Sequence, residues 1–412
     1  MPDREAGNDR KSPALSPPFH LLCACIAWPP SPQRDAAVAA ACASIDDWGA
    51  FLDLLARHRV EGLALSALQR VASHVPQNVL SALSISAARL ARRALILAAA
   101  LGEISAALES EDIPFLTVKG TPLAVIAYGN IGIRHAKDVD ILVRPADFAR
   151  TVAVLKRLGF KRTVPDEEAG PNLLRLWSAL RKDHAFQDGR IELEVHWRLT
   201  DNPFLLSLPW DPSRWRTVAV TSRNSVRTLE PGGLFAYLCV HGAVVGWVRL
   251  KWLADIGALL SQETPAGIRA LFETARSLGV ERAAGQALLL SAQLLQAPVP
   301  HDLLAELSAD RVISGLARGA LHSLIRDGSR ERDKVAFGTA RAALSRFRLV
   351  RSWRFKLREA VYNIANPFDA IETGFPDSLM YLYPLLRPFV WLRMQLKMPP
   401  TKQADSAERR TR

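Results

Sequence analysis

Two aspartates lie one residue apart in the stretch 138–143, whose sequence is DVDILV. Successive side chains of a strand point to opposite faces, so Asp138 and Asp140 share one face while the alternate apolar residues point into a core. Two neighbouring carboxylates repel each other unless a proton or a cation lies between them. Mg²⁺ is usually held by one or two carboxylates together with substrate phosphates. The pattern predicts a buried strand with a cation site on one face, and the alternative is a strand end with two solvated acids.

The segment before this strand has the features of an anion site. Residues 113–118 are apolar and predict a first strand. Gly120 permits a sharp turn out of that strand. Thr121 is suited to cap the helix that follows, and Pro122 suits its first position. The free N–H groups of a helix N-terminus attract an anion, and Lys119 adds a positive charge beside them. Lys119, Gly120 and Thr121 are therefore candidate phosphate contacts, although an ordinary strand–turn–helix connection has the same pattern.

Further polar groups are available to such a site. Arg134 lies in the loop before the aspartates, and a guanidinium matches phosphate oxygens, although a solvated loop arginine is the alternative. In the predicted strand 191–197, Glu192, Glu194 and His196 share one face. Two-metal phosphoryl transfer generally needs a third acid, so one of the two glutamates would complete the site if the strands are neighbours. The alternative is a polar strand face turned to solvent.

An ordered series of motifs resembles the uncharacterised bacterial nucleotidyltransferase family, which belongs to the DNA polymerase β-like nucleotidyltransferase superfamily. The resemblance spans roughly residues 20 to 300. Its core motif is similar to Lys119-Gly120, Leu123-Ala124, Tyr128, Arg134 and the aspartate strand. The flanking motifs are similar to His58-Arg59-Val60, Glu194-Val195-His196-Trp197, and His241 with residues 251–256.

The resemblance implies an α+β fold, in which a small mixed β-sheet nucleotidyltransferase core is embedded in helices and followed by a helical C-terminal region. It implies transfer of a nucleoside monophosphate from an NTP, ATP among them, with Mg²⁺ or Mn²⁺ as cofactor. Asp138, Asp140 and Glu194 would be the catalytic and metal-binding residues, with Glu192 as the substitute for Glu194. The acceptor stays open among a small molecule, a peptide, a protein and RNA.

One departure from the superfamily pattern defines a second hypothesis. The superfamily usually has Gly-Ser where this chain has Lys119-Gly120-Thr121. A catalytically degenerate protein that keeps the fold and binds a nucleotide or a partner is therefore the alternative function. Packing is the favoured interpretation for His196, His241 and Asp255, ahead of a role in holding the base or the acceptor.

The sequence pattern divides the chain into five parts. A disordered N-terminus is expected at 1–18, helices at 19–110, the nucleotidyltransferase core at 111–200, a helical domain at 201–340, and a basic amphipathic helical tail with a disordered end at 341–412. Within the core, the pattern predicts strands at 115–118 and 138–143, helices at 121–128 and 145–158, and a hairpin of 184–187 with 191–197 across Asp188-Gly189.

Composition narrows the partners and the compartment. The chain has 53 basic and 41 acidic residues, a net charge of +12, which favours anionic partners. Its cysteines lack a zinc-binding spacing, so they predict buried free thiols in a reducing compartment; they are Cys23, Cys25, Cys42 and Cys239. No apolar run reaches the ~18 residues of a membrane span, and the run 20–28 is short for a signal peptide. A cytoplasmic protein without a transmembrane segment is expected.

The last part of the chain offers a third interpretation. Arginines in 341–358 are interleaved with Phe347, Trp353 and Phe355, and the stretch 381–398 has a similar character. Such a tail binds nucleic acid by charge and stacking, or an anionic membrane surface. The favoured alternative is a set of basic helices that pack their aromatic faces onto the body.

Overall fold

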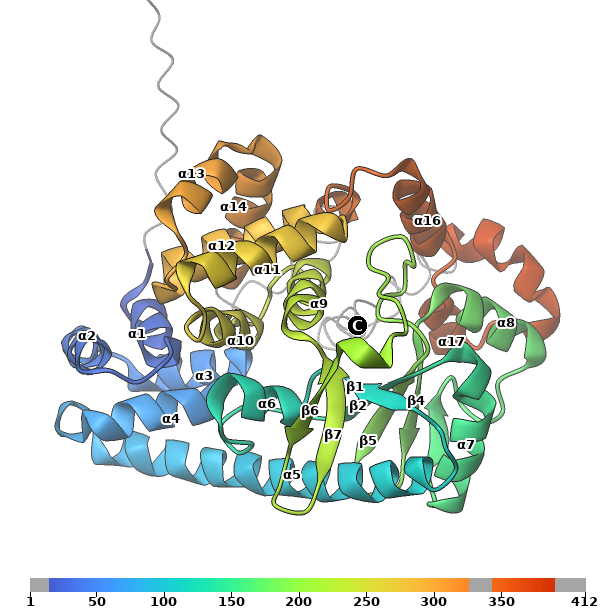
Figure 1. The fold of residues 1–412 in the computed structure, drawn as a ribbon, viewed down its shortest axis with the longest axis horizontal. Coiled ribbons are helices and arrows are strands. Elements are labelled where there is room, and N and C mark those ends of the chain that lie inside the picture. The colour runs from blue at the N-terminus through green and yellow to red at the C-terminus, as the bar shows by residue number, and fades with distance from the viewer. Residues whose placement is uncertain (1–14, 326–342, 390–412) are drawn as a thin grey trace, which may run out of the picture.

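The computed structural model describes residues 15–325 and 343–389. A five-stranded mixed sheet lies among helices (Figure 1), which confirms the predicted α+β class. Two segments were expected to be disordered, 1–18 and the end of the chain. The end of the chain and residues 1–14 lie outside the described residues. Pro17 begins a helix, so the expected disorder at 17–18 is wrong. In the part of the chain that is described, no helix is long and apolar enough to cross a membrane.

The N-terminal region is helical, as predicted. Its elements are α1 (Pro17–Ile26), α2 (Pro32–Cys42), α3 (Trp48–His58), α4 (Glu61–Arg70), the short 3-10 turn η1 (Ala72–His74) and α5 (Gln77–Glu109). Helix α1 covers most of the apolar run at 20–28 and packs it into the main core, which explains that run as core-forming sequence. All four cysteines are buried free thiols, as predicted.

The sheet has the strand order β1-β2-β5-β4-β3. Its strands are β1 (Phe115–Thr117), β2 (Val139–Val143), β3 (Lys161–Val164), β4 (Asp183–Gln187) and β5 (Glu192–His196). Strands β2 and β5 are parallel neighbours, and Asp140 is paired in register with Glu194. The predicted hairpin is confirmed, since β4 and β5 pair antiparallel across a turn in which Gly189 has a φ of +83°.

The two faces of the sheet differ in chemistry. One face packs Ile141 and Val195 against Leu101 of α5, the helix that extends along one side of the molecule beneath the strands in Figure 1. Helix α7 (Phe148–Arg157) joins α5 on this face through Leu155. The opposite face carries Asp140 together with Leu142, which belongs to the main core. The alternation of DVDILV therefore sorts its residues as the strand period predicts.

Several elements depart from the expected pattern. The helix predicted at 145–158 is divided into a 3-10 turn, η2 (Pro145–Asp147), and helix α7. Helix α8 (Pro171–Leu180), by contrast, forms where the sequence predicts a short helix through 173–177, and it precedes β4. Strand β3 was not expected, because it is an edge strand without a buried residue. A second hairpin, β6 (Trp215–Ala219) and β7 (Ser225–Leu229), lies in a region expected to be helical. Its β6 buries one residue, Val218, so the sequence of that strand has little alternation.

Helices complete the chain on the polar side of the sheet. Helix α6 (Thr121–Tyr128) connects β1 to β2, and a 3-10 turn η3 (Pro212–Arg214) precedes β6. The others are α9 (Pro231–Val244), α10 (Leu250–Leu260), α11 (Pro265–Ser277), α12 (Glu281–Leu295), α13 (His301–Ala309), α14 (Arg311–Ile325), α16 (Trp353–Ile364), α17 (Pro367–Thr373) and the 3-10 turn η5 (Asp377–Leu382). Figure 1 shows α9 standing over the strands, so this helix lies above the polar face.

Candidate metal and phosphate site

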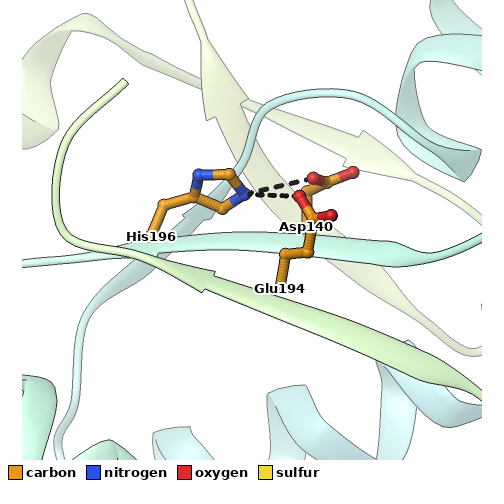
Figure 2. A group of neighbouring side chains, drawn as sticks. All are labelled: Asp140, Glu194 and His196. Atoms are coloured by element: carbon orange, nitrogen blue, oxygen red, sulfur yellow. Dashed lines mark hydrogen bonds and ion pairs between the residues drawn. The ribbon is translucent and has the colours of Figure 1, made fainter. Parts of the chain in front are cut away.

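Three polar side chains meet on the polar face of β2 and β5. The parallel register puts Asp140 beside Glu194, and His196 follows two residues later on the same face. The His196 Nε2 atom lies 3.1 Å from Asp140 Oδ1 and 3.4 Å from Glu194 Oε2 (Figure 2). Asp140 and His196 are 2% and 1% exposed. One atom from each of the three residues lies within 4.8 Å of the others, which is a spacing suited to a metal ion.

The charge of His196 is set by its neighbours. Burial alone would lower its pKa, and Lys182 acts in the same direction. Hydrogen bonds to Asp140 and Glu194 outweigh both effects and raise the pKa, and Asp183 lies 3.7 Å from Nδ1. A protonated imidazole donates hydrogen bonds and has no free lone pair for a cation. In this state His196 holds the two carboxylates in place, and their oxygens are the groups left for a metal.

Lys119 closes the same cluster from the end of β1. Its Nζ lies 2.8 Å from Asp140 Oδ1 and 3.9 Å from Glu194 Oε2. Although burial opposes the charged form, Asp140 leads the groups that raise the Lys119 pKa well above its ordinary value. Burial would raise the pKa of Glu194, but Lys119 and the hydrogen bond with His196 hold it well below its ordinary range. Lys119 and Glu194 are therefore both charged at neutral pH.

The remaining acids occupy different positions. Asp138 lies immediately before β2 and is half-buried. Burial and the nearby charges of Asp140 and Glu194 raise its pKa to about 6. Glu192, by contrast, is exposed and pairs with Lys137 at 2.6 Å. Of the two glutamates considered from the sequence, the structure places Glu194 in the cluster and Glu192 at the surface.

The turn between β1 and α6 depends on a glycine. Gly120 has φ +74° and ψ −139°, a backbone conformation that residues with a Cβ rarely adopt. Gly120 is itself the N-cap, and its carbonyl accepts the first helical hydrogen bond from the Ala124 N–H at 3.2 Å. Thr121 was expected to cap the helix, but it is the buried first residue of α6. The turn thus brings the start of α6 next to Lys119.

Arg134 lies beneath this turn in a buried ion pair. Its Nε and Nη2 atoms donate to the two carboxylate oxygens of Asp255 at 2.8 and 2.9 Å. Tyr128 also donates its hydroxyl to Asp255, at 3.1 Å, and Arg134 Nη1 donates to the Gly120 carbonyl at 3.4 Å. Arg134 therefore supports the turn that carries Gly120. A direct contact between Arg134 and a phosphate stays a prediction.

Two further lysines lie near the cluster: Lys182, which the sequence did not single out, and Lys251, the first residue of the downstream family motif at 251–256. Lys182 lies 3.3 Å from Asp183 and is buried. Burial lowers the pKa of Lys251 well below its ordinary value, and Arg134 and Arg59 act in the same direction. Lys182 directly precedes a strand that the sequence predicts, which is a weak signal for a site residue. The sequence pattern does not show that this strand end lies near β2. The pKa values of Lys119 and Lys182 are raised, so these two ammonium groups are charged and give a positive environment beside the carboxylates that suits a polyanion.

A small cavity of about 50 Å³ adjoins this environment. Lys182, Tyr237 and His241 line one side, and Phe355 and Tyr362 of α16 line another. Burial, followed by Lys119, Lys182 and Lys251, lowers the His241 pKa well below its ordinary value, so the imidazole is neutral. Among the described residues, neither the Tyr237 hydroxyl nor the His241 ring has a hydrogen-bond partner. Both groups line the cavity, and the His241 ring also packs against Tyr237 and Trp252.

Comparison with known proteins gives one match. A family model described as an uncharacterised nucleotidyltransferase matches residues 44–296, which is more than half of the chain. No curated protein and no solved structure matches the chain. The matched range includes all of the carboxylates above, together with Lys119, Arg134, His241 and Lys251.

Proposed function

The chain belongs to the uncharacterised nucleotidyltransferase family, and we propose that it transfers a nucleoside monophosphate from an NTP to an acceptor in a reaction that depends on Mg²⁺ or Mn²⁺. The observation that carries the proposal is the pairing of Asp140 with Glu194 on neighbouring strands, with Asp138 two residues away and Lys119 above them. Clustered acids beside a basic environment are suited to metal-bound triphosphate.

The residues present fit a divalent cation. The Asp140 Oδ2 atom is buried and has no hydrogen-bond partner among the described residues, so one carboxylate oxygen is left for a ligand. The raised pKa of Asp138 reflects burial and carboxylate crowding, and a cation would relieve that crowding. Asp138, Asp140 and Glu194 would hold the metal through oxygen atoms, the donors that Mg²⁺ prefers. A bound cation would neutralise the charge that develops on the phosphates.

The triphosphate would bind at the turn that follows β1. Lys119 can exchange its contact with Asp140 for a phosphate oxygen, since the lysine stem is flexible. The N–H groups at the start of α6, at Gly120 and Thr121, favour negative charge. Arg134 would fix this turn through the Gly120 carbonyl and supply positive charge from below.

The acceptor would approach from the cavity beside His241. Its nucleophilic atom attacks the α-phosphorus in line, the bond from this phosphorus to the bridging oxygen breaks, and pyrophosphate leaves with the electron pair. His241 is neutral and lines the cavity, so it is the group that would receive the proton of the attacking atom. The acceptor class stays open among small molecules, peptides, proteins and RNA.

The test is transfer of label from the four α-³²P-labelled NTPs to an acceptor pool from cell extract, with Mg²⁺ or Mn²⁺ added. The native chain should produce a labelled species, and Asp140→Asn and Glu194→Gln should lower its formation by at least a thousandfold. Glu192→Gln is the matched control, because this exposed glutamate pairs only with Lys137 among the described residues. Equal labelling by all four proteins would overturn the proposal.

One observation favours the second candidate, a nucleotide-binding protein without turnover. Lys119 bridges Asp140 and Glu194, and an ammonium there competes with a metal for the same oxygens. NTP binding that depends on Asp140 but yields no labelled product under any metal would select this alternative.

A further inference from the structure

Helix α16 has an exposed apolar stripe. Trp353, Leu357, Val361 and Ile364 recur at helical spacing and are all exposed, Trp353 to 68% and Leu357 to 58%. Most of the large apolar side chains exposed in the described chain lie between residues 344 and 389. Scattered exposed apolar residues need no explanation, but a continuous stripe on one helix face marks an interaction surface.

The opposite face of α16 is anchored to the body. Phe355, Glu359 and Tyr362 are buried. Asn202 Nδ2 donates to the Phe355 carbonyl at 3.0 Å and to Glu359 at 3.2 Å. Arg346 pairs with Glu359 at 3.3 Å. These contacts fix the rotation of α16, so the apolar stripe faces outward in a defined orientation.

Basic side chains border the stripe on both sides. At 100° per residue, Arg354 and Arg358 lie on one border of the stripe and Lys356 lies on the other. Arg354 and Lys356 are exposed, whereas Arg358 is partly buried and donates to the Ala179 carbonyl. Long basic side chains beside an apolar stripe let their stems cover apolar surface while the charged ends reach a polar layer.

We propose that the outer face of α16 docks on an anionic lipid surface. An interfacial helix buries an apolar face at the boundary of headgroups and acyl chains, and its basic borders bind anionic headgroups. Both features are present here, and the centre of the stripe is largely aliphatic.

Two other occupants fit the face less well. Single-stranded nucleic acid is bound by charge along the groove and by stacking of successive bases on aromatic rings, whereas Trp353 is the one ring of this stripe and its other three members are aliphatic. A second copy of the chain would bring together two faces that are both bordered by basic side chains, and like charges repel. The acid of α16, Glu359, is buried and paired, so it cannot offset that repulsion.

Docking would have a consequence for the site. The inner face of α16 lines the cavity that also contains His241, through Phe355, Glu359 and Tyr362. A lipid-bound α16 would therefore hold this cavity close to the membrane surface. The docking argument itself depends only on the outer face and stands apart from the proposed chemistry.

The experiment is flotation of the full chain with vesicles of phosphatidylcholine alone and with 30% phosphatidylglycerol. The native chain should bind the anionic vesicles at least tenfold more tightly than the neutral ones. Leu357→Glu with Val361→Glu should weaken this binding at least tenfold. Leu95→Glu is the matched control, because Leu95 is 60% exposed on α5, far from α16 in the sequence, and its substitution should leave binding unchanged. Circular dichroism and thermal melting establish that each variant is folded.

A charge variant separates the effect of the basic borders from that of the apolar stripe. Arg354→Glu with Lys356→Glu should remove the preference for anionic vesicles, and binding of the native chain should fall as salt increases. Absence of binding to anionic vesicles, or binding unaffected by Leu357→Glu with Val361→Glu, would overturn the proposal. Two further results would overturn the proposal if they were found in place of vesicle binding. One is a native dimer that Leu357→Glu with Val361→Glu dissociates, and the other is RNA binding that the same substitutions abolish.

Discussion

Arg134 and Asp255 form a buried two-pronged ion pair that joins the sheet to the C-terminal helices. Arg134 precedes β2 and Asp255 lies in α10, and two guanidinium nitrogens contact both carboxylate oxygens at 2.8 and 2.9 Å. Tyr128 donates a third hydrogen bond to Asp255. Since Arg134 also contacts the Gly120 carbonyl, the pair couples helix packing to the conformation of the candidate phosphate turn.

Arg134→Met should destabilise the protein strongly. The substitution leaves the Asp255 carboxylate buried with Tyr128 as its remaining neutral donor, and breaking such a pair costs about 3–5 kcal/mol of unfolding free energy. Arg134→Met with Asp255→Leu removes both charges, so most of that loss should be recovered. Urea unfolding of the three proteins measures the difference. Equal stability of the single and double variants would show that the unpaired Asp255 carboxylate is not the cause of the loss.

The strand pattern was sufficient to predict which residues lie on the polar face of the sheet. Because the side-chain period of a strand is two, DVDILV and the residues around Glu194 sort into a core face and a polar face without knowledge of the fold. Their adjacency in register could not be predicted, since β2 and β5 are separated by more than forty residues and pair only through the topology. The family resemblance favoured Glu194 over Glu192 as the third acid, a choice that the residue pattern left open.

The rest of the site depends on long-range packing. Lys182, Tyr237 and His241 line one cavity because α9 packs on the polar side of the sheet, and no local signal specifies that contact. Strands β3 and β6 were missed because they bury one residue at most, so their sequences carry little alternation. Strand β7 does alternate and buries Val226, Thr228 and Leu229, so its missed prediction has no such reason. Arg134 lies in a loop, where the sequence pattern favours a solvated side chain. In the structure it is buried and pairs with Asp255, an acid more than a hundred residues away.

Lys119→Met should strengthen metal binding while it weakens turnover. The ammonium 2.8 Å from Asp140 neutralises the cluster without a metal, so its removal leaves Asp138, Asp140 and Glu194 repelling one another. The melting temperature without divalent cation should fall, and Mn²⁺ should bind about tenfold more tightly, a change of about 1.4 kcal/mol. Titration of Mn²⁺ by electron paramagnetic resonance checks the affinity, with Lys137→Met as the surface control. Weaker Mn²⁺ binding in Lys119→Met would show that Lys119 does not compete with the metal.

His58 should make stability fall as the pH is lowered. Burial, followed by the charges of Arg57 and Arg249, lowers its pKa from 6.5 to about 3, and its Nδ1 accepts a hydrogen bond from the Leu250 N–H at 3.1 Å. Between pH 6.5 and 3 the unfolded chain binds a proton that the folded chain does not, so unfolding becomes more favourable as pH falls. At pH 5 the loss is about 2 kcal/mol relative to pH 7.

The matched variant for His58 is His58→Asn, whose amide oxygen can accept the same hydrogen bond but does not titrate. Urea unfolding of both proteins at pH 7 and pH 5 gives the change in unfolding free energy for each. The native chain should lose about 2 kcal/mol more than His58→Asn. His184 has a pKa lowered to about 4, mainly by burial, and its contribution cancels in this difference. Equal losses would show that His58 is not the titrating group.

Gly120→Ala should impair nucleotide binding, whereas Gly129→Ala at the other end of α6 should not. A Cβ at Gly120 would lie 3.7 Å from the Asp138 carbonyl, an ordinary contact, so the cost comes from φ +74° with ψ −139°. That strain is about 1–3 kcal/mol, and its relief moves the start of α6 away from Lys119. Gly129 has φ +68° with ψ 7° and open space around it, so alanine costs about 1–2 kcal/mol there without touching the turn. Equilibrium binding of labelled NTP should fall at least tenfold for Gly120→Ala alone; equal affinities would place the triphosphate elsewhere.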